Sequence, residues 1–204
     1  MDIYKRPYSK NYPVVCMDES PKQLISTIRK GRSVQPGKDA TVDSEYLRHG
    51  MCNVFIANEP LIGKRFVVVK EQKTKKDWAH FIKQIADEWY HDAKRITLVM
   101  DNLTTHSVSS LYENFIPEEA KRIADRFEFI FTPKHGSWLN MAEIELNVLN
   151  GQCLNRHIDT IEEVRNEAKA WQNHRNNRTN KITWQFTTKD ARIKLKKLYP
   201  SIHD

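Results

Sequence analysis

The stretch YPVVCMD, residues 12–18, decides how this chain folds. It is short and apolar and contains β-branched valines, which is typical of a buried strand, and it ends on Asp18. A second apolar run, ITLVMD at 96–101, also ends on an aspartate, Asp101. The sequence therefore predicts two buried strands that each finish with a carboxylate.

The pattern on either side of these runs alternates between strand and helix. Strand-like stretches at 45–57 and 64–71 predict an antiparallel hairpin, and FEFIFT at 127–132 predicts a further strand. Apolar spacing or terminal signals predict helices at 76–91, 107–126, 137–154, 161–174 and 188–198. Strands separated by helices favour parallel neighbours, and the hairpin makes the sheet mixed. We expect an α/β fold, a ribonuclease H-like mixed sheet flanked by helices.

The 204 residues are enough for a single domain over 1–204 with a buried core. Residues 20–43, with two prolines, two glycines and little periodicity, predict a mobile loop, and residues 175–204 predict a basic helical tail. Without an apolar run of ~20 residues or a signal peptide, we expect no membrane segment and a cytoplasmic protein. Three scattered cysteines argue for a reducing compartment and against zinc or disulfides.

The charge balance is basic, with 33 Lys and Arg against 26 acidic residues and a net charge of +7. This balance is compatible with a polyanionic partner, although many proteins without one are equally basic. Candidate contacts to a DNA backbone lie in the 20–43 loop and in the tail. They are Arg29, Lys30, Arg32, Lys189, Arg192 and Lys196. Solvated faces remain the alternative for each cluster.

The two strand-ending aspartates are candidate catalytic residues. In α/β sheets, chemistry is placed where strand ends face a crevice, so neighbouring strands would bring Asp18 and Asp101 to one site. Aspartate also caps helices and starts turns, and this alternative is strongest for Asp101, which precedes Asn102 and a predicted helix.

A third acid is predicted from the helix in HGSWLNMAEIELNVLN, residues 135–150. At ~100° per residue, Asn140, Glu143, Asn147 and Asn150 form one polar stripe on a helix that is otherwise almost wholly apolar. Such a helix is buried, so its polar stripe should face a wet cavity. Glu145 falls among apolar neighbours, where we expect a structural ion pair or a local surface opening. Glu143 is therefore the expected third acid.

Three convergent carboxylates repel one another unless a cation lies between them. Hard oxygen ligands suit Mg²⁺ or Mn²⁺, and two such ions can promote in-line attack by water or a 3′-hydroxyl on a phosphodiester. No Ser-His-Asp order and no Gly-rich phosphate loop competes for the role. The pattern predicts metal-dependent phosphoryl transfer.

The segments VVCMDES, ITLVMDNLTTH and FTPKHGSWLNMAEIELNVL resemble the three catalytic blocks of the DDE transposases of bacterial insertion sequences, in the mariner-like superfamily. The tail WQFTTKDARIKLKKLYP is similar to the end of these proteins. The resemblance implies two-metal chemistry with Asp18, Asp101 and Glu143 as metal ligands. Glu143 corresponds because LNMAE at 139–143 stands where the family has Leu-Asn-x-x-Glu.

The resemblance also implies a function and partners. Such an enzyme cleaves DNA at transposon ends and joins the 3′-OH to target DNA, as a dimer or higher oligomer on DNA, and is associated with the nucleoid when it acts. Full-length members carry an N-terminal helix-turn-helix region that reads the ends, whereas this chain begins almost at the first catalytic strand. We therefore expect end recognition to lie in a missing region or a partner chain. The stretch between Asp101 and Glu143 also looks longer than in well-known mariner-like members.

Further residues receive weaker expectations. His106 matches the family's Asp-Asn-x-x-x-His and would orient a phosphate or a metal-bound water, or only bond the backbone at a helix start. Asn102 and Asn140 are expected to support the carboxylates. Lys134 and His135 would touch the DNA backbone, and Trp138 would stack on a base or lie buried.

Two rival functions remain open on the sequence alone. A ribonuclease H-like nuclease acting on hybrids or junctions would usually show a fourth acid and lack the NMAEIE block. A non-catalytic DNA-binding relic of a decayed element is the alternative of another class.

Overall fold

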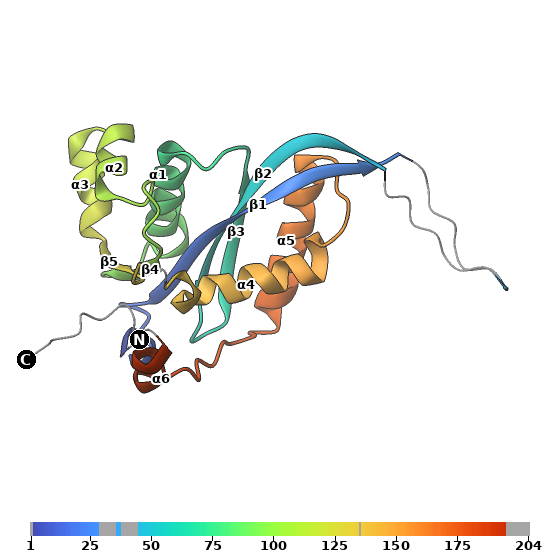
Figure 1. The fold of residues 1–204 in the computed structure, drawn as a ribbon. Coiled ribbons are helices and arrows are strands. Elements are labelled where there is room, and N and C mark those ends of the chain that lie inside the picture. The colour runs from blue at the N-terminus through green and yellow to red at the C-terminus, as the bar shows by residue number, and fades with distance from the viewer. Residues whose placement is uncertain (1, 29–35, 38–44, 135, 195–204) are drawn as a thin grey trace, which may run out of the picture.

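The computed structural model describes residues 2–28, 36–37, 45–134 and 136–194 (Figure 1). Their sheet contains β1 (Val14–Thr27), β2 (Tyr46–Glu59), β3 (Lys64–Lys70), β4 (Ile96–Met100) and β5 (Phe127–Phe131). The strand order is β3-β2-β1-β4-β5. The β1–β2 and β2–β3 pairs are antiparallel, and the β1–β4 and β4–β5 pairs are parallel. The expected mixed sheet is therefore confirmed.

Helices cover both faces of the sheet (Figure 1). One face packs against α1 (Lys75–Gln84), its π-helical continuation η2 (Ile85–Trp89), α2 (Val108–Asn114) and α3 (Pro117–Asp125). The other face packs against α4 (Met141–Leu149), preceded by η3 (Ser137–Leu139) and followed by η4 (Asn150–Leu154), and against α5 (Ile161–Asn177). The short η1 (Asp2–Lys5) and α6 (Thr188–Lys194) precede and follow this layered body. In the part of the chain that the structure describes, no helix is both long and apolar enough to span a bilayer.

The apolar start of β1 follows from burial on both faces. Val15 and Met17 lie in the core beneath α1, α2 and α3, whereas Val14 and Cys16 lie in the core beneath α4 and α5. Successive side chains of a strand point to opposite faces, so a strand covered on both sides is continuously apolar. The run that decides the fold is apolar for this reason.

The prediction of a loop from residue 20 is wrong for residues 20–27, which continue β1 and pair with β2 from Ser20↔Val54 to Thr27↔Tyr46. The end of this part of β1 extends with β2 beyond the helices as a two-stranded ribbon (Figure 1). Leu24 is its one buried residue and belongs to the core beneath α4 and α5, so the segment shows little apolar periodicity. β4 pairs with β1 only as far as Cys16, so Pro21 lies where β1 has a single neighbour, and a proline is tolerated there. Residues 29–35 and 38–44 of the predicted loop lie outside the described residues.

The prediction of a helical tail holds only in part. α5 ends at Asn177, residues 178–187 are not helical, and α6 covers Thr188–Lys194. The non-helical segment crosses the β2–β3 turn, where Ile182 N donates to Pro60 O at 3.1 Å. Gly63, with φ 67°, fits against it so closely that a Cβ would come 2.5 Å from Asn180 O. The tail is therefore packed against the sheet.

The edge strand β3 is covered along its outer side by polar side chains of α5. Asn176 accepts from Arg65 N at 2.9 Å and donates to Arg65 O at 2.8 Å. Gln172 accepts from Val67 N at 2.7 Å, and Arg165 donates to Val69 O at 3.4 Å. These bonds satisfy peptide groups that an edge strand otherwise presents to other chains.

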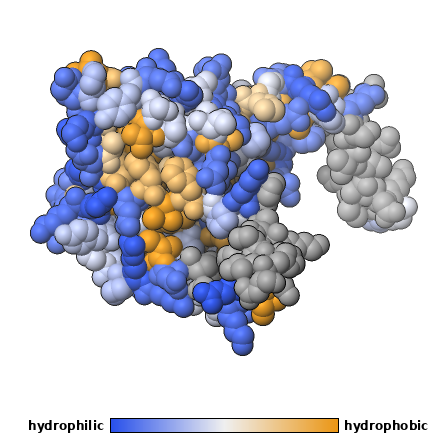
Figure 2. Space-filling view, turned by 60° about the vertical axis from the view of Figure 1, so that its left-hand side comes forward, coloured by the Kyte–Doolittle hydropathy of each residue, from blue (hydrophilic) through white to orange (hydrophobic). Residues whose placement is uncertain are grey.

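The opposite side of the molecule has an apolar band at its surface. Figure 2, in which the side holding α2, α3 and β5 comes forward, shows a hydrophobic band between hydrophilic borders. Exposed apolar side chains in and around these elements are Val108, Tyr112, Ile116 and Phe131.

Candidate active site

Three separate elements supply the three predicted acids. Asp18 is the fifth residue of β1 rather than its end, Asp101 directly follows β4, and Glu143 lies in the first turn of α4. β1 and β4 are parallel neighbours with Cys16 opposite Val99, and both of these residues face α4 and α5. Since side chains alternate, Asp18 and Asp101 two residues later face the same side.

The three carboxylates influence one another electrostatically. The pKa of Asp18 is raised to about 7, first by burial and then by the charges of Glu19, Asp101 and Glu143. A hydrogen bond from Glu19 N, 2.8 Å from Asp18 Oδ1, opposes the rise. Within the described residues, no three His, Cys, Asp or Glu side chains form a group tight enough to be identified as a metal centre. The charges of the three acids thus interact, but the side chains do not form a closed metal site.

Asn140 fixes the start of α4 relative to β1. Its buried amide donates to Met17 O at 2.7 Å and accepts from Ala142 N at 3.1 Å, which caps the helix. Among the described residues, the hydrogen bonds of the Asn140 side chain thus go to backbone groups and not to a carboxylate. Asn140 acts on the backbone immediately before Asp18 instead. Asn102 likewise donates to Thr132 O rather than to an acid.

His106 contacts two carboxylates. Its Nδ1 lies 2.7 Å from Asp101 Oδ1, its Nε2 lies 3.1 Å from Glu19 Oε2, and the ring stacks on Trp78 at 5.9 Å between centroids. Burial lowers the pKa of His106, but the bonds to Asp101 and Glu19 outweigh it and raise the pKa to about 9. The same contact with His106 lowers the pKa of Asp101. The expected bond to the backbone alone does not describe this arrangement, and the expected orientation of a phosphate or a metal-bound water stays a prediction.

Glu19 is a residue of this site that sequence reasoning missed. Its side chain is 4% exposed, and Lys73 Nζ lies 3.9 Å from its Oε1. The signal was present, because an acid one position after Asp18 faces the interior if the strand continues. Ending the predicted strand at residue 18 hid it.

Glu145 lies on the opposite side of α4 from this site. It is completely buried, with Oε2 2.8 Å from Arg65 Nε and Oε1 3.1 Å from Arg175 Nη2. The expected structural ion pair is confirmed and includes a second arginine. Glu143 is partly exposed, as the polar stripe requires, and Asn147 and Asn150 further along the stripe are exposed.

A family model described as DDE superfamily endonuclease matches residues 13–165, which is more than half of the chain. The chain belongs to the DDE superfamily of endonucleases. Asp18, Asp101 and Glu143 all lie within the matched region. No curated protein matches the chain.

Solved structures agree with this assignment at the level of the fold. The Mos1 mariner paired-end complex with Mn is 15% identical with a TM-score of 0.56, over 88% of this chain and 53% of that chain. The Mos1 transposase paired-end complex with left transposon end is 15% identical with a TM-score of 0.56, over 84% and 51%. The Mos1 strand transfer complex is 14% identical with a TM-score of 0.56, over 88% and 52%. The fold is thus ribonuclease H-like, and the chain spans about half the length of these proteins.

The remaining candidates of this DDE-family chain are exposed, pack against the tail, or fall outside the described residues. Lys134, Lys189 and Arg192 are exposed. The ring of Trp138 packs against Phe186 at 5.0 Å and Lys194 Nζ at 4.6 Å, so the tail covers it and base stacking is not supported. The predicted contacts that fall outside the described residues are His135, Arg29, Lys30, Arg32 and Lys196.

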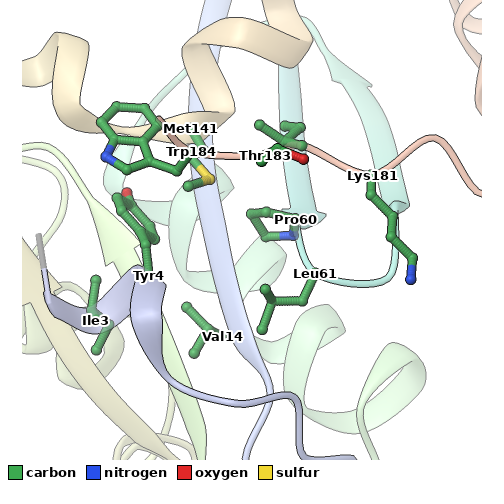
Figure 3. A pocket seen from close by; sticks show the side chains of 10 residues that line it. Ile3, Tyr4, Val14, Pro60, Leu61, Met141, Lys181, Thr183 and Trp184 are labelled. Carbon is green, nitrogen blue, oxygen red and sulfur yellow. The ribbon is translucent and has the colours of Figure 1, made fainter. Parts of the chain in front are cut away.

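A cavity of ≈ 270 Å³ lies apart from the acids (Figure 3). It is formed where the tail crosses the start of β1, between η1, the β2–β3 turn and the start of α4. Tyr4 and Trp184 pack against each other on its wall, with ring centroids 5.2 Å apart. Tyr4 also donates to Leu139 O at 2.8 Å, which anchors η1 to the segment before α4.

Proposed function

We propose that this chain is the catalytic part of a transposase of a bacterial insertion sequence, of the mariner-like type. It would cleave DNA at transposon ends and join the 3′-OH to target DNA by two-metal phosphoryl transfer, with Asp18, Asp101 and Glu143 as the catalytic acids. One observation carries the proposal. Within a DDE-family fold, the carboxylates of Asp101 after β4 and Glu143 in α4 are close enough to raise the pKa of Asp18 in β1 by their charges.

The donor set fits Mg²⁺ or Mn²⁺. All three side chains offer hard oxygens, and two of them are already oriented by backbone donors: Glu19 N holds Asp18 Oδ1, and Leu103 N holds Asp101 Oδ1 at 3.2 Å. The raised pKa of Asp18 indicates that an added cation would stabilise the site. Two bound ions would supply activation of the attacking hydroxyl and stabilisation of the leaving oxygen.

Within this scheme the protein's own residues hold and orient the acids. Asn140 fixes α4, and with it Glu143, to the backbone beside Asp18. His106 holds one oxygen of Asp101. This arrangement favours catalysis over a decayed, purely DNA-binding relic, because the supporting contacts as well as the acids are intact.

The fourth acid, Glu19, does not favour the rival ribonuclease H-like nuclease. It directly follows Asp18 on β1, so its side chain leaves the opposite face of the strand. There it is bonded to His106 and close to Lys73. It is therefore engaged within the protein and is not a free fourth ligand.

DNA would be held through its phosphates by exposed basic residues. The net charge of +7 and the exposed Lys134, Lys189 and Arg192 support backbone contacts that are nearly independent of sequence. The Mos1 structures are described as paired-end and strand transfer complexes. By analogy we propose a dimer or higher oligomer on DNA, acting in the cytoplasm at the nucleoid, with end recognition supplied by a further region or a partner chain.

Nicking of supercoiled plasmid in Mn²⁺ tests the proposal. The wild-type chain should nick, and Asp101→Asn should not, because the variant keeps the size of the side chain but loses the charge. Asp125→Asn is the matched control, since the one ion pair of Asp125 among the described residues is with exposed Lys121 at the end of α3. Equal nicking by wild type and Asp101→Asn would refute the assignment. A wild-type chain that binds DNA without nicking it would favour the relic.

A further inference from the structure

Glu19 is linked to both aspartates of the site, to Asp18 through its backbone and to Asp101 through His106. Its N–H donates to Asp18 Oδ1 at 2.8 Å. Its carboxylate reaches Asp101 on the neighbouring strand through His106, at 3.1 Å and 2.7 Å. Glu19 and His106 are 87 residues apart in sequence, so only the fold brings them together.

The imidazole between the two carboxylates has no freedom to rotate. Trp78 stacks on its face, Asp101 and Glu19 hold its two nitrogens, and the side chain is 1% exposed. Removing Glu19 would leave a buried ring N–H without an acceptor, which favours rotation of the ring and of the acid bonded to it.

The contacts to the Asp101 carboxylate all involve the same oxygen. Oδ1 receives His106 Nδ1 and Leu103 N, and among the described residues no hydrogen bond or ion pair reaches Oδ2. The carboxylate is therefore held from one side and keeps the other oxygen for a ligand. Contacts of this kind beyond the ligands themselves typically change metal affinity or activity 10–100-fold.

We propose that Glu19 is a positioning residue of the acidic site, which fixes the Asp101 carboxylate through His106 while its backbone holds Asp18. The inference rests on the proposed metal-binding function. A role in stability alone is the competing explanation, because the Glu19 side chain is buried on the same face of β1 as Met17, which lies in the core beneath α1.

Direct Mn²⁺ binding, measured from the EPR signal of the free ion, separates the two explanations. Glu19→Ala should weaken the Kd by about 10–100-fold. His106→Ala should have a similar effect, and the double variant should be no weaker than either single one, because both act along one path. Glu19→Gln should recover most of the affinity, since its amide oxygen still accepts from the ring. Glu128→Ala, which removes an acid paired with Arg6 and Thr97, should change stability alone.

The outcomes distinguish this inference from the proposed function. If Glu19→Ala lowers the Tm but leaves the Mn²⁺ Kd unchanged, Glu19 is only structural and the inference is wrong. If Asp101→Asn binds Mn²⁺ as well as wild type, or wild type does not bind it, the proposed function fails instead. The imidazole N–H signals of His106 in NMR spectra then decide. Glu19→Ala should expose the Nε2–H to exchange and shift the Nδ1–H bonded to Asp101, and an unchanged Nδ1–H signal would overturn the inference.

Discussion

Two glutamates on α4 lie two positions apart and have opposite surroundings. Glu143 is partly exposed, and its charge, like that of Asp101, raises the pKa of Asp18. Glu145 is completely buried between Arg65 and Arg175. A helix turns ~100° per residue, so positions i and i+2 point to opposite sides, and one helix can serve two environments.

The difference lies in how each acid is neutralised. The chain supplies Glu145 with two guanidinium groups, so this cluster is complete without any ligand. The other site has four acids, Asp18, Asp101, Glu143 and Glu19. Among the described residues their ion pairs are those of His106 with Asp101 and Glu19, and that of Lys73, 3.9 Å from Glu19. Acids that a fold brings together without matching cations are typical of functional sites, whereas paired buried acids are typical of structural ones.

The largest effect is expected for Glu143→Gln. It should lower the rate of plasmid nicking about a thousandfold or more, equivalent to about 4 kcal/mol. Folding should be unaffected or slightly favoured, because like-charge repulsion near Asp18 is relieved. Nicking assays in Mn²⁺ and thermal melts of the same preparation measure both effects. A variant that nicks at the wild-type rate would remove Glu143 from the site.

Glu145→Gln should affect stability instead. It leaves Arg65 buried without its countercharge, which costs about 3–5 kcal/mol and lowers the Tm by about 10 °C. Nicking by the folded protein at low temperature should persist. The double variant Glu145→Leu/Arg65→Met should recover part of the lost Tm, because it removes both buried charges. Loss of nicking in a folded Glu145→Gln protein would contradict the division between the two glutamates.

Divalent metal should stabilise the protein through the acids Asp18, Asp101 and Glu143, and not through the buried ion pairs of Glu145. At about 100 times its Kd, Mn²⁺ would add about 2.7 kcal/mol to the free energy of unfolding and raise the Tm by about 5–10 °C. Asp18→Asn and Asp101→Asn should abolish the shift, and Glu145→Gln should keep it despite its lower starting Tm. A shift that survives both aspartate substitutions would place the metal elsewhere.

The smallest effect concerns pH without metal. Burial raises the pKa of Asp18 to about 7 in the folded chain, so folding favours its neutral form. Protonated Asp18 therefore contributes to the free energy of unfolding. This contribution is fully present below the ordinary carboxyl pKa near 4 and is lost as pH rises through 7. In EDTA, Asp18→Asn should therefore melt above wild type at pH 8 but not at pH 4, by on the order of 1 kcal/mol or a few degrees. Parallel melting curves across this pH range would argue against the raised pKa.

The sequence was most informative where burial acts on every residue of an element. The starts of β1 and β4 are apolar because both faces are covered, and α4 shows a polar stripe because only one side faces an opening. These patterns predicted the sheet, its two neighbouring aspartates and the choice of Glu143.

Pairings across the fold could not be predicted in this way. Glu19 and His106 are 87 residues apart, and Arg65 and Glu145 are 80 residues apart, so neither contact leaves a local pattern. The extension of β1 to Thr27 was missed because Leu24 is its one buried residue, and a single buried position makes no apolar period. Asn140 illustrates a third limit, since its polar stripe position did not reveal that it bonds backbone rather than a carboxylate.

The α5 side chains along β3 have a consequence for where this chain can be cut. The family match ends at residue 165, before Gln172 and Asn176, which satisfy the peptide groups of Val67 and Arg65. A fragment ending there would present an open edge strand to its copies, and such edges template aggregation. The second half of α5 thus acts as a solubility element for the sheet, and a protein shortened at the family boundary should precipitate where one extending through residue 177 stays in solution.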